Sequence, residues 1–409
     1  MEKYDVVVIG GGPAGCKTAE YIGAKSRRVM VVEEHLQIGE PLQCAGLISP
    51  RTLTAAGVTG EVVKNSIRGA VVHAPSGEEL IIRGHTTYAL VIDRAGFDRA
   101  LSERAQSKGV TIVTGTRAEV AQSHKEGVNI RLKSGSAETA VCAKLVIGAD
   151  GPNSRVARHI GSPALDNRVL MSAAEVETEC QQLDMVHIFL GREVAPGWFG
   201  WLIPVDKHHA RIGTGVSISK GNDAGLGAGK PLACLERLLM SYPRLFKGLT
   251  ITRYTGGFIP VGRPAAMFSE RTLLVGDAAC QVKPVSGGGL YLGMLGAGLC
   301  AEAAIGALAE ENFTAPYLAG YQKAWETAMS DEIRVALRHR EAFLSFSDQD
   351  MNDLIRFFKK PLWQSIILKY GDIDYISRLA GRLSFASPWA NKFLRYLSAA
   401  KTSLSSSGG

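Results

Sequence analysis

The sequence of 409 residues predicts a mixed α/β fold: a Rossmann-like nucleotide-binding domain, an inserted β-sheet domain and a helical C-terminal part. Three observations predict it. A strand, a glycine turn, a helix and a second strand follow one another over residues 4–33. Two further strand-like runs, each followed by an acidic residue, stand far downstream. The segments between them are rich in strand and turn signals.

The N-terminal element carries the strongest local signal. A β-branched run, Tyr4–Ile9, opens into Gly10-x-Gly12-x-x-Gly15, and a second short strand ends at Glu33. In this pattern the glycines allow a tight turn, close approach of a pyrophosphate and close packing of helix on strand. The helix N-terminus favours phosphate, and the acid is placed to accept from ribose hydroxyls. A dinucleotide site is the prediction, and an empty glycine turn is the structural alternative.

The nucleotide domain is predicted to be discontinuous. Leu145–Ile147 precedes Asp150 and Leu273–Val275 precedes Asp277, so we expect neighbouring strand ends of one sheet. The expected division is listed here: residues 1–69, 92–165 and 256–310 form the nucleotide domain, 70–91 and 166–255 the β-sheet substrate domain, 311–401 a helical region and 402–409 a loose tail. The uncharged run Val285–Ala301 is expected to be a buried helix, with membrane insertion as the alternative.

Composition narrows the class of protein. Hydrophobic residues make up 46% and charged residues 21%, as in ordinary globular proteins, and the net charge of +7 permits an anionic partner. The seven scattered cysteines fit no disulfide framework, iron–sulfur cluster or zinc site, so we expect no metal and a reducing, cytoplasmic compartment.

Three distant motifs identify the dinucleotide. They are Val91–Leu101, Asp150–Ser154 and Arg271–Ala279, and in this order they resemble the FAD-dependent hydroxylase-like superfamily typified by p-hydroxybenzoate hydroxylase. The resemblance covers roughly residues 1–310. It implies an FAD cofactor, with Asp277 and Arg94 near the ribityl chain and phosphates, and Ala118 beside the adenine. Arg158 stands one position later than the family's usual arginine in the second motif.

The loop of glycines before residue 290 completes the implied flavin site. Glycines there let backbone lie against a flat ring, and the following helix would aim its positive end at the flavin. A plain glycine-rich helix start is the alternative. The residues expected to bind FAD are Gly10, Gly12, Ala14, Gly15, Glu33, Cys44, Ala45, Leu47, Arg94, Ala118, Asp277, Gly287, Gly288, Gly289 and Leu290.

Two further stretches narrow the resemblance. The loop Gly39–Pro50 contains Cys44, and Phe199-x-Trp201-x-Ile203-Pro204 is followed eight residues later by Gly213-x-Gly215. Together they resemble the geranylgeranyl reductase family, whose second motif normally has Tyr and Phe where this chain has Phe199 and Ile203. The resemblance implies reduction of isoprenoid double bonds. It also implies substrate contacts from residues of the second motif: Phe199, Trp201, Pro204, Gly213 and Gly215.

Reducing an isolated alkene is difficult because no carbonyl polarises it. A feasible route delivers hydride to one carbon and a proton to the other in a dry pocket. Cys44 is the candidate catalytic residue, since a thiol is mostly protonated at neutral pH and can donate. An inert buried cysteine is the alternative reading. Phe199 and Trp201 are expected to line a polyprenyl tunnel, although strand aromatics commonly belong to a core.

The predicted partners follow from this chemistry. We expect a polyprenyl lipid substrate of the archaeal phospholipid type, with geranylgeranyl diphosphate or a prenylated quinone or pigment precursor as alternatives. An external electron donor is required, and NADPH, ferredoxin and a deazaflavin all stay open. The basic C-terminal region, as a head-group or bilayer contact, predicts a peripheral position on the inner face of the cell membrane. No nucleic-acid partner is expected.

Three rival functions share parts of the pattern. A flavin-dependent halogenase would have a motif similar to Phe199–Pro204, but it lacks the cysteine loop, and we find no counterpart of its lysine. An aromatic hydroxylase of the same fold does not account for the Cys44 loop or the apolar, basic C-terminal part. An electron-transfer flavoprotein feeding a quinone is the third, and the cysteine spacing excludes its cluster domain.

Overall fold

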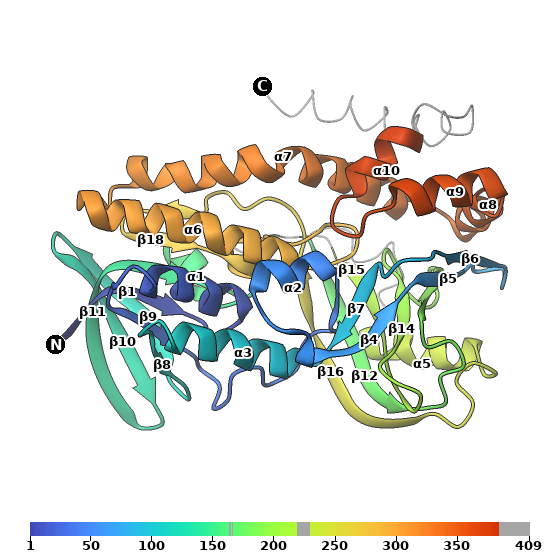
Figure 1. Cartoon of the computed structure of the whole chain (residues 1–409), viewed down its shortest axis with the longest axis horizontal. Helices are drawn as coiled ribbons and strands as arrows, with labels where there is room; N and C mark the ends of the chain where they lie inside the picture. Colours follow the sequence, from blue (N-terminus) through green and yellow to red (C-terminus); the bar gives the residue numbers. More distant parts are fainter. Residues whose placement is uncertain (163–164, 166, 219–229, 384–409) are drawn as a thin grey trace.

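The fold was analysed in a computed structural model that describes residues 1–162, 165, 167–218 and 230–383 (Figure 1). Its first sheet has eight strands, with five in the order β18-β11-β1-β2-β8 paired in parallel. The bounds are β1 (Glu2–Ile9), β2 (Val29–Val32), β8 (Thr111–Val113), β9 (Arg117–His124), β10 (Gly127–Ser134), β11 (Ala137–Gly148), β17 (Phe268–Ser269) and β18 (Thr272–Leu274).

The parallel strands are near-continuous apolar runs because helices and a hairpin cover the sheet. Helix α1 packs against α3 and α6, and α7 lies on α6 (Figure 1). Since β11 and β18 lie side by side next to β1, the expected grouping of distant strand ends is confirmed. Up to residue 310, and apart from α5 of the second sheet, the helices and helical turns are α1 (Pro13–Gly23), α2 (Pro50–Ala56), η1 (Gly60–Val62), α3 (Arg94–Gln106), α4 (Arg155–His159), η2 (Gly276–Ala279) and α6 (Leu290–Glu310).

The second sheet has seven strands in the order β16-β12-β15-β14-β13-β5-β6, and α5 (Pro231–Ser241) packs on β12 and β15. Its strands are β5 (Gly69–His73), β6 (Glu79–Arg83), β12 (Arg168–Glu177), β13 (Met185–Phe189), β14 (Gly200–Pro204), β15 (His209–Ile218) and β16 (Thr250–Pro260). β16 carries this sheet to Pro260, so the boundary expected after residue 255 falls inside a strand. The reason is pairing: β12 holds β16 along its length.

A third, small sheet joins the two larger ones. It has the order β3-β7-β4, from β3 (Leu47–Ile48), β7 (Ala89–Ile92) and β4 (Val63–Ile67). The segment expected as 70–91 therefore divides, with β5 and β6 in the second sheet and β7 in the third. This small sheet holds the end of the cysteine loop beside the start of α3.

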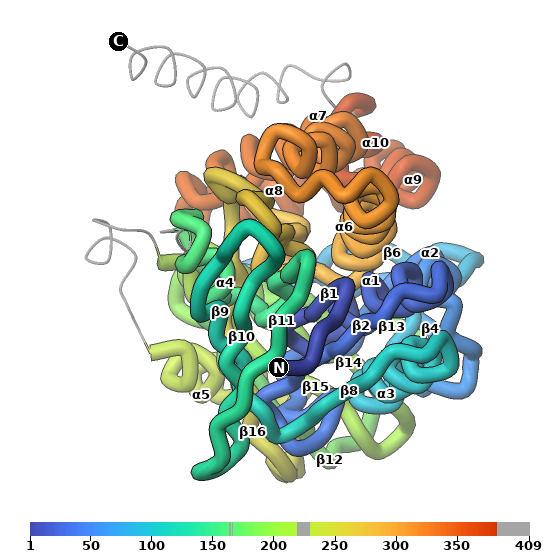
Figure 2. The backbone as a smooth tube through the Cα atoms, turned by 90° about the vertical axis from the view of Figure 1, so that its left-hand side faces the viewer, coloured from blue at the N-terminus to red at the C-terminus, as the bar shows by residue number. Residues whose placement is uncertain are grey.

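Helices make up the described C-terminal part, as expected. They are α7 (Ala315–Ser345), α8 (Asp348–Phe358), α9 (Pro361–Tyr370) and α10 (Ile376–Leu383). Figure 2 shows them gathered on one side of the molecule, and α8 and α9 contact β6 while α10 contacts α7 and α9. The expected helical residues 384–401 and the tail 402–409 lie outside the described residues.

Helix α6 begins at Leu290, five residues after the start of the apolar run that predicts it, because Gly287 takes a left-handed conformation before it. Among the described residues, it alone is long and apolar enough to cross a membrane, judged by length and composition. Its buried side chains belong to the main core, between α1 and α7. The structure therefore shows α6 as a helix in the interior of the protein.

Candidate active site

One cavity of about 1230 Å³ lies where the three sheets and the C-terminal helices meet. Its lining comes from the carboxyl ends of β1, β2 and β11, from the cysteine loop, from the inner face of the second sheet and from α7, α9 and α10. The structure brings most of the predicted site residues into this lining: Gly10, Gly12, Ala14, Glu33, Cys44, Ala45, Leu47, Arg94, Ala118, Phe199, Trp201, Asp277, Gly287, Gly288, Gly289 and Leu290.

The glycine turn shapes one end of the cavity. Gly10 has φ +108°, and a Cβ there would lie 2.2 Å from the Ala149 carbonyl oxygen, so only glycine fits. Gly15 packs against the Gly10 carbonyl oxygen, at 2.1 Å from an ideal Cβ, and lies outside the lining. At Gly12 an added Cβ would meet nothing within 4 Å. This open backbone at the start of α1 fits a pyrophosphate group.

Glu33 is held in place beside this turn. One carboxylate oxygen accepts from the Gly11 N–H at 2.7 Å, and the other accepts from the His35 N–H at 2.9 Å. The His35 ring lies 2.6 Å from the same oxygen. The carboxylate is thereby oriented at the carboxyl end of β2, where the ribose of a dinucleotide would lie. Ala118, at the start of β9, lines the cavity nearby with Thr116 and Arg117.

A charged cluster lies further along the cavity. Arg94, at the first position of α3, donates to both oxygens of Asp98, at 2.8 and 2.9 Å. Burial opposes its charge, but Asp98 and the adjacent Cys44 sulfur outweigh it and raise the pKa of Arg94. Burial raises the pKa of Asp277 to about 6, although the charge of Arg94 acts in the opposite direction. Both side chains line the cavity, so they are available to polar atoms of a bound cofactor.

The cysteine loop is anchored by a residue that the sequence analysis missed. Arg211, buried on β15, donates to the carbonyl oxygens of Ala45 at 2.9 Å and Ile92 at 3.0 Å. The Gly46 N–H in turn donates to the Cys44 sulfur at 3.3 Å. Arg211 thus fixes the loop to the small sheet and holds Cys44 at the cavity. Its signal was a lone arginine in the strand His209–Ile218, which has no other Lys, Arg, Asp or Glu.

Aromatic rings form the wall beyond the cysteine loop. Trp198 stacks on Phe199 with ring centroids 5.0 Å apart, and Phe199 contacts Trp201 edge to face. Trp198, which the motif did not include, also lines the cavity, and its ring lies 3.2 Å from an ideal Cβ on Gly287. This places the aromatic wall directly beside the loop that is expected to face the flavin.

Three predicted substrate contacts have a different position. Gly213 and Gly215 lie outside the cavity lining, and an added Cβ would lie 2.2 Å from the Trp201 ring and 2.3 Å from the Trp198 ring. Their role in the structure is to leave room for these rings. Pro204, at the end of β14, is also outside the lining. These three residues therefore do not line the cavity. Gly213 and Gly215 make room for rings that do, and substrate contact by the three residues stays a prediction.

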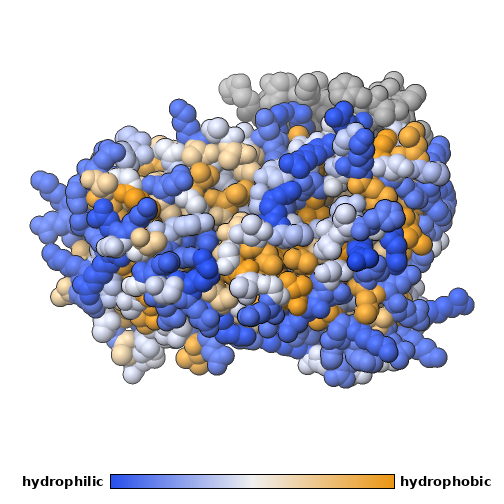
Figure 3. All heavy atoms as spheres, in the orientation of Figure 1, coloured by the Kyte–Doolittle hydropathy of each residue, from blue (hydrophilic) through white to orange (hydrophobic). Residues whose placement is uncertain are grey.

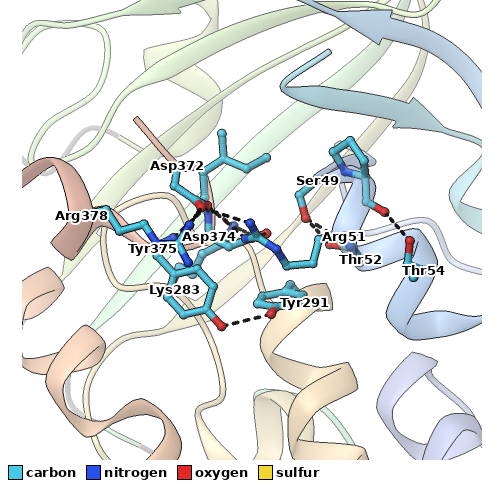
Figure 4. A network of polar contacts seen from close by, with 12 residues as sticks. Ser49, Arg51, Thr52, Thr54, Lys283, Tyr291, Asp372, Asp374, Tyr375 and Arg378 are labelled. Carbon is cyan, nitrogen blue, oxygen red and sulfur yellow. Dashed lines mark hydrogen bonds and ion pairs between the residues drawn. The ribbon is translucent and has the colours of Figure 1, made fainter. Parts of the chain in front are cut away.

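A polar network closes the cavity from the C-terminal side (Figure 4). Asp374, which is 2% exposed, accepts from Arg51 at 3.1 Å and from Lys283 at 3.0 Å. Asp372 pairs with Arg51 and with Arg378. Burial opposes the ionisation of Asp372, but the hydrogen bonds from Arg51 and from the Asp374 N–H outweigh it and lower its pKa.

This network connects three parts of the site. Arg51 stands at the end of the cysteine loop, and the Lys283 side chain lies against Gly288 in the glycine loop. Tyr291 of α6 lies 3.0 Å from Tyr375, oxygen to oxygen. We call the segment Gly371–Arg378 the C-terminal strap. The sequence analysis missed it because no local pattern marks it.

The fold and this cavity define a class, the FAD-dependent oxidoreductases. Residues 3–302 match the family described as an FAD binding domain, and the residues at the glycine turn fit that cofactor. An uncharacterized protein of Methanocaldococcus jannaschii is 33% identical over 379 residues, covering 91% of this chain and 92% of that one. A digeranylgeranylglycerophospholipid reductase of the same organism is 30% identical over 360 residues, covering 86% and 89%.

A solved structure gives the same fold over the whole chain. It is a geranylgeranyl bacteriochlorophyll reductase-like protein from Thermoplasma acidophilum, 21% identical, with a TM-score of 0.85 and coverage of 97% of this chain and 100% of that one. The chain belongs to the FAD-binding family and, within it, to the geranylgeranyl reductases.

Proposed function

We propose that this protein saturates the isoprenoid double bonds of geranylgeranyl chains, in the synthesis of archaeal-type digeranylgeranylglycerol phospholipids. The observation that carries the proposal is the continuity of the cavity. Its dinucleotide end, the Cys44 loop and an apolar wall of Phe199 and Trp201 line one space. A long apolar chain can therefore lie beside the flavin without crossing solvent. The relative named digeranylgeranylglycerophospholipid reductase supports it by its name.

The residues divide the work of the reaction. Bound and reduced, FAD would supply the hydride. The aromatic wall would exclude water and hold the alkene against the glycine loop. A positive charge that develops on the alkene would then lie beside the faces of the aromatic rings. Cys44 would give the proton to the second alkene carbon, and Arg211 would hold the loop so that the sulfur stays in reach.

The direct test is the product. The purified protein is checked for bound FAD by absorbance, reduced with dithionite under argon and given geranylgeranyl phospholipid. We expect mass gains of two hydrogens per double bond without oxygen. If the flavin is reduced and the lipid stays unchanged, the proposal fails, and oxygen-dependent assays with halide or aromatic substrates test the rival halogenase and hydroxylase functions.

Replacing Cys44 should slow the proton transfer to the alkene without changing the binding or reduction of FAD. We expect Cys44→Ser and Cys44→Ala to lower the rate of double-bond reduction by at least about 100-fold, because general acids contribute that much. FAD content and reduction by dithionite should stay unchanged. Cys180→Ser is the matched control, since this partly exposed thiol lies outside the cavity lining. Near-normal activity in Cys44→Ala would assign the proton to another group.

We also propose that the protein works at the inner face of the cell membrane. Ile81 of β6 and Leu362 of α9 are 50% and 66% exposed on elements that contact each other, with Lys359 and Lys360 close by in sequence. Figure 3 shows apolar side chains on this side of the molecule. Apolar side chains with neighbouring lysines suit an anionic bilayer surface. The electron donor, whether NADPH, ferredoxin or a deazaflavin, stays open.

Vesicle flotation tests the membrane surface. We expect Leu362→Glu to reduce binding to anionic phospholipid vesicles by about tenfold, because the change removes apolar burial and adds a repelled charge. Met240→Glu is the control, since Met240 is 69% exposed on α5, a different helix. Equal binding by the wild type and Leu362→Glu would remove this surface from the proposal.

A further inference from the structure

The second sheet forms a continuous floor for the arm of the cavity that leads away from the cysteine loop. Its lining residues come from all seven of its strands, from β16 at one edge to β6 at the other. Paired positions place Ile82 beside Ala70 and Ala70 beside Val186. Ile188 of β13 is paired with Trp201 of β14. These side chains share the face that lines the cavity.

The length of this floor can be derived from the strand order. β12 and β6 are separated by five inter-strand steps, which at about 4.8 Å each make about 24 Å. The main chain of a geranylgeranyl group, about sixteen carbons at about 1.3 Å per bond along its axis, spans about 20 Å when extended. The floor is therefore long enough for the whole chain.

The distant part of the arm is lined by both the second sheet and helix α9. The floor there is made by Ile82, Ala70 and Val186, and the roof by Ile367 and Leu368 of α9. Ala70 is the smallest side chain of the floor row and stands between two β-branched ones. A chain that extends along this row beyond the aromatic wall would lie over Ala70.

We infer that Ala70 sets the length of the prenyl chain that the site accepts, because its methyl group is smaller than the side chains of Ile82 and Val186 on either side of it in the cavity lining. The inference rests on the proposed function and names a specificity-determining residue for it. A larger side chain at this position shortens the arm at β5 and leaves the part beside Trp201 and Cys44 unchanged. Long and short substrates are then affected differently.

The test compares Ala70→Trp with the wild type on geranylgeranyl and geranyl diphosphate, by binding to the oxidised protein and by reduction. We expect the variant to lose about tenfold or more in affinity and in kcat/KM for the geranylgeranyl substrate, and less than about twofold for the geranyl substrate. Ala140→Trp is the matched control, because Ala140 is exposed on β11, away from the cavity. Ala70→Leu should give a smaller loss in the same direction, and it serves if the tryptophan variant unfolds.

The outcomes separate the two proposals. If the wild type, reduced with dithionite, leaves the geranylgeranyl phospholipid unchanged, the proposed function fails. If the wild type reduces the geranylgeranyl substrate and Ala70→Trp and Ala70→Leu do so equally well, the function stands and the inference about Ala70 is wrong. Equal losses on both substrates also overturn it, since a length limit acts on the long chain alone.

Discussion

Gly12→Val should leave a folded protein that no longer binds FAD. An added Cβ at Gly12 would have no protein atom within 4 Å, and its backbone is extended, so the substitution fits the protein itself. The space that the side chain would enter is the open side of the glycine turn, where the pyrophosphate must approach the backbone. We expect an FAD affinity at least about 100-fold lower, with the melting temperature of the apoprotein changed by less than about 2 °C.

The control for this experiment is Gly60→Val. Gly60 also has open space around an ideal Cβ, and it lies outside the cavity lining. Gly15→Val is a poor choice, because a Cβ there would lie 2.1 Å from the Gly10 carbonyl oxygen and would disturb the fold as well. Wild-type FAD content in Gly12→Val would place the pyrophosphate elsewhere in the cavity. Titration of the apoprotein with FAD, followed by flavin fluorescence, measures the difference.

The dinucleotide end of the cavity could be predicted from the sequence. The turn, the helix start and the end of β2 are local features, and a stretch of 24 residues from Gly10 to Glu33 contains all their chemistry. The neighbouring strands β11 and β18 could also be placed, because each is a short apolar run followed by an acidic residue. Local patterns of this kind are repeated wherever the same backbone geometry is required.

The positions of other residues depended on contacts that no local pattern reports. The Gly-x-Gly of β15 could be found as a motif, but only the packed structure shows that it makes room for Trp198 and Trp201. Arg211 is the one Lys, Arg, Asp or Glu residue of β15, and its partners Ala45 and Ile92 come from other segments of the chain. The strap is the extreme case, since Arg51 and Asp372 are separated by 321 positions in the sequence. Pairing at this distance follows from the topology alone.

Asp374 is the residue on which the strap depends most. It is buried, it accepts from Arg51 and Lys283, and Ile373 and Asp374 themselves line the cavity. Asn has nearly the same shape but no charge, so Asp374→Asn leaves two cations facing a neutral side chain. Arg51 keeps Asp372, whereas Lys283 keeps only the Ile373 carbonyl oxygen. The contact between the strap and the glycine loop should therefore weaken first.

We expect Asp374→Asn to open the strap locally while the two large sheets stay folded. Amide exchange over residues 371–383 should become about tenfold to 100-fold faster, and kcat/KM for the lipid should fall by about tenfold, because water enters beside the reacting chain. FAD content should change little, since the Glu33 carboxylate is held by Gly11 and His35 and not by the strap.

Two further variants make this result specific. Asp353→Asn is the matched control, because Asp353 pairs with Arg356 on the surface of α8 and does not line the cavity. Arg51→Met combined with Asp374→Asn should cost less than the sum of the single changes, since each single change already breaks the same ion pair. Additive effects, or exchange rates in Asp374→Asn that match those of the wild type, would show that packing of α9 and α10 alone holds the strap, and that the ion pairs contribute little to closing the cavity.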